Sequence, residues 1–133
     1  MIVDSSALVA IIKREPERAA FSALLESTQD VKTSAATYFE TAIVIDSLRN
    51  PIMSHLLDDL IERAGIIIEP VTPEQARIAR QAYRDYGRGS GHPATLNFGD
   101  CFSYALARAK REPILYKGDD FGHTDLRSAA QQP

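Results

Sequence analysis

Short apolar runs alternate with longer amphipathic stretches along the chain. The short runs are rich in Ile and Val and predict β-strands at 1–3, 31–33, 66–68 and 113–116. Between them, apolar residues recur at spacings of three and four, which predicts helices over 5–12, 16–27, 35–49, 51–64, 73–86 and 97–110. Strands that alternate with helices favour an α/β fold, in which a small, mostly parallel sheet of four to five strands is covered by helices on both faces.

Capping residues mark several of the predicted helix ends. Thr72, Pro73 and Gln75 supply an N-cap, a first-turn proline and a capping-box partner for the helix 73–86. Asn97 is a suitable N-cap for the last helix, and the tail 124–133 is a candidate for a short edge strand. The apolar positions expected to face the core are Ala76, Ala79, Tyr83 and Tyr86 in helix 73–86, and Ile52, Leu56, Leu57, Leu60 and Ile61 in helix 51–64.

Length and composition fit one globular domain over residues 1–133. The chain has 44% hydrophobic and 25% charged residues and a net charge of -3, so it has no overall positive field that would attract nucleic acid. It has one cysteine, Cys101, in an apolar helix, which suits an inert buried thiol and a cytoplasmic location. The N-terminus lacks a basic, then apolar, leader, and no apolar stretch is long enough to span a membrane.

Acidic residues follow the predicted strands or begin the helices after them. Because right-handed crossovers bring the carboxyl ends of parallel strands to one edge, these residues are expected to converge at that edge. They are Asp4 after the first strand, Glu40 in the helix after the second, Asp100 at the start of its helix, and Asp119 and Asp120 after the last strand.

Each acid also has a purely structural explanation. Asp4 is a good helix N-cap, Asp100 complements the helix dipole, and Asp119 and Asp120 are typical turn residues. Glu40 is harder to explain in this way, because its neighbours at helical spacing are Ala36, Thr37, Ile43 and Val44, and an unpartnered carboxylate is costly on such a face. By contrast, Asp46 on the same helix neighbours Arg49 and Asn50 and is expected at the surface.

Clustered carboxylates repel one another unless they share protons or a cation. Their oxygen ligands favour a hard ion, Mg²⁺ or Mn²⁺, while His55, His92 and His123 lack metal-ligand spacing and are expected in surface or core roles. The helix 73–86 and its end carry a row of basic residues, which is either a solvated face or a phosphate-binding ridge: Arg77, Arg80, Arg84 and Arg88.

Four segments of the chain resemble one known family. MIVDSSALVAII, ATYFETAIVI, LNFGDCFSYALA and PILYKGDDF stand in the order typical of the PIN-domain ribonuclease toxins of the VapC type. The resemblance implies a three-layer α/β/α fold, cleavage of RNA with Mg²⁺ or Mn²⁺, a homodimer, and a VapB-like antitoxin as inhibitor. Asp4, Glu40 and Asp100 match the family's first three acids, and Asp120 matches the fourth, with Asp119 as a further metal ligand to consider.

The last motif departs from the family pattern. Family members commonly carry an acid where Gly118 stands, so the number of metal ions stays open. In such a site the cation would make hydroxide available near neutral pH and offset charge on the transition state. Following the resemblance, the antitoxin is expected on the helices that carry Leu24, Leu25, Ile43, Leu56 and Leu60.

Two other readings compete with the nuclease. An α/β phosphohydrolase with an aspartyl nucleophile would also begin like MIVDSS, but it needs a second aspartate where Ser6 stands. A receiver-like signalling module needs a phosphoacceptor aspartate at the end of a middle strand, and neither 31–33 nor 66–68 ends in Asp. A Ser-His-Asp triad has no support, because no nucleophile-elbow sequence is present.

Overall fold

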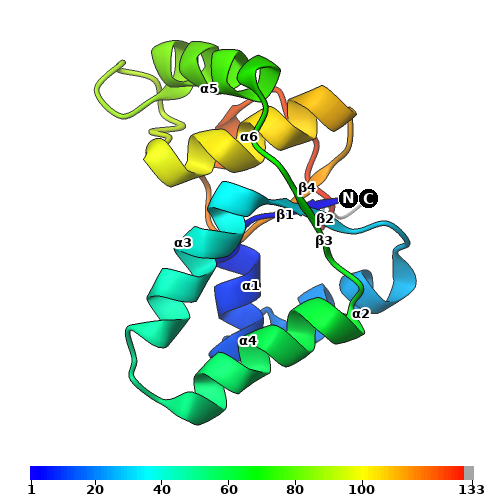
Figure 1. Cartoon of the computed structure of the whole chain (residues 1–133). Helices are drawn as coiled ribbons and strands as arrows, with labels where there is room; N and C mark the ends of the chain where they lie inside the picture. The colour runs from blue at the N-terminus through cyan, green and yellow to red at the C-terminus, as the bar shows by residue number, and fades with distance from the viewer. Residues whose placement is uncertain (131–133) are drawn as a thin grey trace.

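The computed structural model describes residues 1–130 and contains one parallel sheet (Figure 1). Its strands are β1 (Ile2–Val3), β2 (Lys32–Ser34), β3 (Ile67–Glu69) and β4 (Ile114–Leu115), in the order β3-β2-β1-β4. In the central strand, Ile2 is in register with Lys32 on one side and with Ile114 on the other. The tail adds a single parallel bridge between Ile114 and Ser128, and the end of the predicted edge strand, 131–133, lies outside the described residues.

The helices begin close to where their capping residues predict. Asp4, Ser34, Asn50, Thr72 and Asn97 each accept a hydrogen bond from a backbone N–H of the first turn that follows them. The helices are α1 (Ser5–Ile12), α2 (Arg18–Ser27), α3 (Ala35–Asp46), α4 (Pro51–Arg63), α5 (Pro73–Tyr86) and α6 (Phe98–Lys110), followed by a 3-10 turn, η1 (Phe121–His123). The third helix stops at Asp46, short of the predicted 49, and Arg49 has a left-handed φ of 52°.

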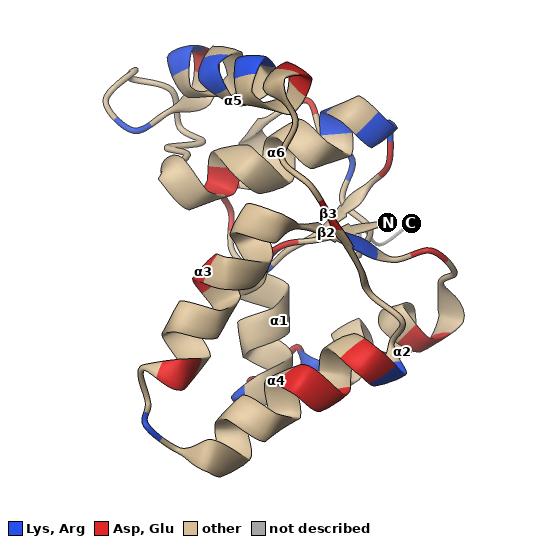
Figure 2. Ribbon diagram, in the orientation of Figure 1, with Lys and Arg blue, Asp and Glu red and all other residues tan. Residues whose placement is uncertain are grey.

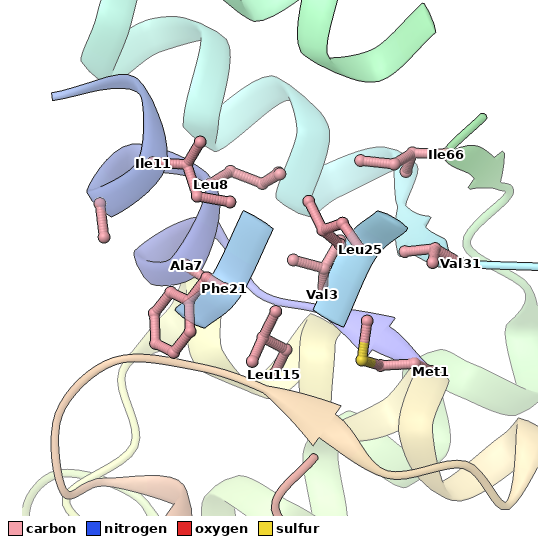
Figure 3. Packing of buried hydrophobic residues seen from close by; sticks show 11 residues of the cluster. Met1, Val3, Ala7, Leu8, Ile11, Phe21, Leu25, Val31, Ile66 and Leu115 are labelled. Carbon is pink, nitrogen blue, oxygen red and sulfur yellow. The ribbon is translucent and has the colours of Figure 1, made fainter. Parts of the chain in front are cut away.

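Alternating side chains of the sheet separate two cores. Val3 and Leu115 point to one face and pack with residues of α1 and α2, together with Val31 and Ile66 (Figure 3). Ile2 and Ile114 point to the other face and pack against α6, with α5 outside it (Figure 1). The predicted three-layer α/β/α architecture with a small parallel sheet is therefore confirmed.

Several predicted core positions are wrong. In α5, Ala76 is exposed and Tyr83 is 50% exposed, because the helix turns Ile78, Ala79, Ala82 and Tyr86 inward instead. In α4, Ile52 is 71% exposed, since it lies in the first turn beyond the reach of the core that buries Leu57. β3 is an edge strand, and its Ile67 and Ile68 remain about two-fifths exposed.

No helix among residues 1–130 combines the length and the apolar character that crossing a membrane requires.

Candidate active site

Asp4 leaves β1 at the carboxyl edge of the sheet and is almost completely buried. Its Oδ2 accepts hydrogen bonds from the backbone N–H and the hydroxyl of Ser6, at 3.0 and 2.7 Å. Its Oδ1 accepts from the hydroxyl of Ser103 at 2.5 Å, and that hydroxyl also lies 3.0 Å from the hydroxyl of Thr37. Asp4 thus caps α1, as predicted from its position in the sequence. It is also hydrogen-bonded to Ser103 of α6, which in turn contacts Thr37 of α3.

Glu40 reaches from α3 to the start of α6. Its Oε1 accepts a hydrogen bond from the hydroxyl of Ser5 at 2.9 Å. Its carboxylate lies so close to Gly99 that a Cβ at position 99 would stand 2.0 Å from Oε2. The carboxylate therefore fits in this place only because residue 99 has no side chain. Burial raises the pKa of Glu40, and the Ser5 hydrogen bond opposes the rise while the charge of Asp4 adds to it.

Asp100 occupies the third position of α6, as its spacing from Asn97 predicts. The two residues form a capping box, in which the Asp100 N–H donates to Asn97 Oδ1 at 2.9 Å and the Asn97 N–H donates to Asp100 Oδ2 at 3.0 Å. Burial raises the pKa of Asp100 to about 7, against the hydrogen bond from Asn97, and the charges of Asp4, Asp120 and Glu40 raise it further.

The loop after β4 brings one of its two acids toward this group. Phe121 is 2% exposed and packs against Tyr116, with ring centroids 5.3 Å apart, so it anchors the loop in the core. Asp120, directly before it, lies near enough to raise the pKa of Asp100, while Asp119 is not among the charges that do so. Gly118 has a φ of 101°, a turn that a non-glycine residue would adopt only with strain.

The fold therefore brings together Asp4, Glu40, Asp100 and Asp120 from four separate segments. Within residues 1–130, no three His, Cys, Asp or Glu side chains are arranged as a ready metal site. Both oxygens of Asp4 and one oxygen each of Glu40 and Asp100 instead accept hydrogen bonds from hydroxyl or backbone donors. The donor set nevertheless suits a hard cation, because it is composed of oxygen. The pKa values of Glu40 and Asp100 are raised chiefly by burial and further by the neighbouring negative charges, which a cation would offset.

The remaining candidates lie outside the acidic cluster. The basic row of α5 and its end is exposed, and several basic positions follow one another along the α5 ribbon in Figure 2. No carboxylate within residues 1–130 forms an ion pair with this row. His55 and His123 are exposed, whereas His92 packs edge-on against Tyr86 with ring centroids 4.9 Å apart and accepts a hydrogen bond from the N–H of Ala94. The thiol of Cys101 is buried, as predicted, and burial raises its pKa to about 11.

Sequence reasoning missed the small residues that support the acids. Ser103 follows Asp100 by three positions and shares its helix face, which was a usable signal for a polar group in an otherwise apolar helix. Ser5 and Ser6, at the start of α1, both donate hydrogen bonds to carboxylates of the cluster, and nothing in the sequence around them distinguishes this role from that of ordinary residues at a helix start. Gly99 carried no signal of its own, because its role depends on a side chain 59 positions earlier in the chain.

A family model and several similar sequences point to the same protein family. Residues 1–126 match the model of the PIN domain. The chain is 57% identical to the VapC ribonuclease Mb0625 of Mycobacterium bovis and to ribonuclease VapC28 of Mycobacterium tuberculosis, over 97% of this chain and of each relative.

Two solved structures share the fold at low sequence identity. One is Mycobacterium tuberculosis VapC20, titled a sarcin-ricin loop cleaving toxin, with a TM-score of 0.74 at 20% identity over 99% of this chain and 98% of that one. The other is a toxin-antitoxin complex from Klebsiella pneumoniae, with a TM-score of 0.73 at 14% identity over the same shares of the two chains. Together, the full-length sequence match and the three-layer fold establish that the chain belongs to the PIN-domain family.

Proposed function

We propose that the chain is a metal-dependent ribonuclease and the toxin of a type II toxin-antitoxin pair. The observation that carries the proposal is the meeting of Asp4, Glu40, Asp100 and Asp120 at the carboxyl edge of the parallel sheet, where two of them have raised pKa values. The names of the relatives that match over nearly the full chain support the same activity. The phosphohydrolase and receiver readings have no comparable support.

Asp4 and Asp100 are the residues we propose as direct ligands of Mg²⁺ or Mn²⁺, with Glu40 and Asp120 completing the site directly or through water. When bound, the cation would lower the pKa of coordinated water and offset charge on the phosphate. Binding would require Asp100 to exchange its hydrogen bond from Asn97, or to keep it on one oxygen while the other faces the ion. Asp4 needs less adjustment, because Ser6 and Ser103 already fix its orientation.

Glu40 is suited to a proton-handling role as well as to metal binding. Its raised pKa brings protonation closer to neutral pH, and Ser5 holds one of its oxygens while the other faces Gly99 at the start of α6. In this position Glu40 can orient the attacking water or accept its proton. Arg77, Arg80, Arg84 and Arg88 supply an exposed positive row for the RNA backbone, despite the net charge of -3.

We infer that a VapB-like antitoxin occupies the groove between α1, α2 and α4. This groove has a volume of about 480 Å³, and its lining is mixed: apolar residues that include Ile11, Leu25, Leu56 and Leu60 stand beside Arg14, Arg18, Arg63, Glu26 and Asp59. Not every residue expected from the sequence to contact the antitoxin is accessible. Leu25 is 3% exposed and belongs to the core, whereas Ile43 on α3 is 53% exposed.

The exposed apolar side chains of α3 support a homodimer. Phe39 and Ile43 are 65% and 53% exposed and lie one helical turn apart, so they form a continuous apolar strip. A second copy packed on this strip would remove it from water. A cytoplasmic location, where RNA and a reduced Cys101 would both be found, agrees with this function.

The direct test is incubation of purified protein with mixed cellular RNA, with Mn²⁺ or with EDTA. We expect cleavage with Mn²⁺ and none with EDTA, and no cleavage by an Asp4→Asn variant that unfolds at the wild-type temperature. Cleavage that persists in EDTA, or an active Asp4→Asn variant, would contradict the proposal. Co-expression with the adjoining reading frame, followed by pull-down, tests the antitoxin separately.

A further inference from the structure

A shallow hollow of about 560 Å³ lies between α5 and α6, beside the acidic cluster. Its lining is largely apolar and includes Ala79, Arg80, Tyr83, Arg88, Phe98 and Phe102. The cluster described above does not use these residues, although Phe98 precedes Gly99 and Asp100 directly in the chain.

Two aromatic rings of this hollow are exposed to an unusual degree. Phe98 is 79% exposed and Tyr83 is 50% exposed, whereas side chains of this size are ordinarily among the most buried. Such exposed apolar area is costly in water and marks a surface that a ligand covers.

Both rings are held in place by the protein itself. Tyr83 packs on Gly87, where an added Cβ would stand 2.5 Å from its ring, and its hydroxyl donates to the carbonyl of Arg88 at 3.1 Å. Phe98 makes an edge-to-face contact with Phe102, with ring centroids 4.9 Å apart. The rings are therefore preorganised, so a ligand that stacks on them would not bear the full entropic cost of ordering them.

The charge around the rings is positive. Arg80 and Arg88 line the same hollow, and Arg77 and Arg84 continue the row on α5, whose ribbon carries several basic positions in Figure 2. None of the four forms an ion pair with a carboxylate of residues 1–130. Aromatic faces interleaved with arginines are the pattern by which proteins hold single-stranded nucleic acid, with bases stacked on the rings and phosphates beside the guanidinium groups.

We propose that Phe98 and Tyr83 form a stacking site for unpaired bases of the RNA next to the cleaved bond, with Arg80 and Arg88 on the adjoining phosphates. The site deepens the proposed ribonuclease function and rests on it. It selects single-stranded segments, because paired bases are already stacked within a duplex and cannot cover these rings. A second copy of the chain is a poorer occupant, since a two-fold contact on this face would bring two arginine rows together.

The test is fluorescence anisotropy with a short, labelled single-stranded RNA in EDTA, compared with the same RNA carrying abasic positions. Three variants are measured: Phe98→Leu keeps apolar bulk but removes the aromatic face, Phe98→Trp keeps a stacking face, and Ile52→Ala removes a similarly exposed apolar side chain from α4. Sedimentation is recorded for each variant, and cleavage with Mn²⁺ is measured in parallel.

We expect Phe98→Leu to weaken binding of the intact RNA by roughly tenfold and to leave the abasic RNA almost unaffected. Phe98→Trp and Ile52→Ala should bind like the wild type, and Arg80→Gln should reduce the salt dependence of binding by about one counterion. Unchanged affinity of Phe98→Leu, or equal weakening for intact and abasic RNA, would overturn the stacking site. Loss of self-association with unchanged RNA affinity would assign the face to a second copy instead. If the wild type cleaves no RNA, it is the ribonuclease proposal that fails.

Discussion

Replacing Asp100 with Asn should stabilise the metal-free protein while it abolishes RNA cleavage. In the folded chain the pKa of Asp100 is raised from 3.8 to about 7, chiefly by burial. An asparagine at this position loses the charge that burial and the neighbouring acids disfavour. Its side-chain oxygen can still accept the hydrogen bond that the Asn97 N–H donates, so the capping box need not be lost.

The sign of the effect follows from the protons bound in each state. Between about pH 4 and pH 7 the folded chain keeps a proton on Asp100 that the unfolded chain has released, so the free energy of unfolding falls as pH rises through this window. A rise in pKa from 3.8 to about 7 corresponds to about 4 kcal/mol. Asp100 is only partly buried, and solvent screening should reduce the difference to about 1–2 kcal/mol at pH 8.

The assay is urea unfolding of wild type and Asp100→Asn in EDTA at pH 5 and pH 8, repeated with Mn²⁺. Asp58→Asn, which changes an exposed acid of α4, is the matched control and should show no such gain. We expect wild type and Asp100→Asn to differ little in free energy of unfolding at pH 5, and Asp100→Asn to be more stable at pH 8. Mn²⁺ should stabilise the wild type far more than Asp100→Asn. A variant that is less stable than wild type at pH 8 in EDTA would refute the electrostatic reasoning.

Three further substitutions test the cluster from other sides. Gly99→Ala should displace the carboxylate of Glu40, which lies where the new Cβ would stand. Kinetics should show cleavage lowered at least tenfold, while calorimetry on the same sample should show less than about 1 kcal/mol lost from the free energy of unfolding. Ser103→Ala removes a hydroxyl that donates to Asp4. It should lower the free energy of unfolding, measured in urea, by about 1–3 kcal/mol and weaken Mn²⁺ binding in titration calorimetry. Wild-type values for both would contradict the hydrogen-bond network. Asp120→Asn should reduce Mn²⁺ affinity and cleavage more than Asp119→Asn, because Asp120, unlike Asp119, is among the charges that raise the pKa of Asp100. The reverse order would contradict the assignment.

Much of the fold is predictable because its signals are local. The caps at Ser34, Thr72 and Asn97 fix helix starts through hydrogen bonds within one turn, and the alternation of strands and helices leads directly to a parallel sheet. Burial was less predictable, because it depends on which neighbour a helix face meets. Tyr83 belongs to an apolar stripe in the sequence, yet α5 turns Ile78, Ala82 and Tyr86 toward the core and leaves Tyr83 half exposed.

The acids of the candidate site could be found from sequence, because each follows a strand or begins a helix and the topology carries all of them to one edge. Their supports could not be found in this way. The contact of Glu40 with Gly99 and the hydrogen bond from Ser103 to Asp4 join residues far apart in the chain, and no local pattern specifies them. The exposure of Phe98 was equally hidden, since a phenylalanine beside an apolar helix is expected in the core.

The most direct test of the central claim is anomalous diffraction from crystals grown with Mn²⁺. The account predicts a manganese peak about 2.1 Å from carboxylate oxygens of both Asp4 and Asp100, with Glu40 and Asp120 facing the ion or its waters. The same crystals of Asp100→Asn should lose the peak or show it greatly weakened. No peak at this edge, from a preparation that cleaves RNA with Mn²⁺, would contradict the proposal that these acids hold the catalytic metal.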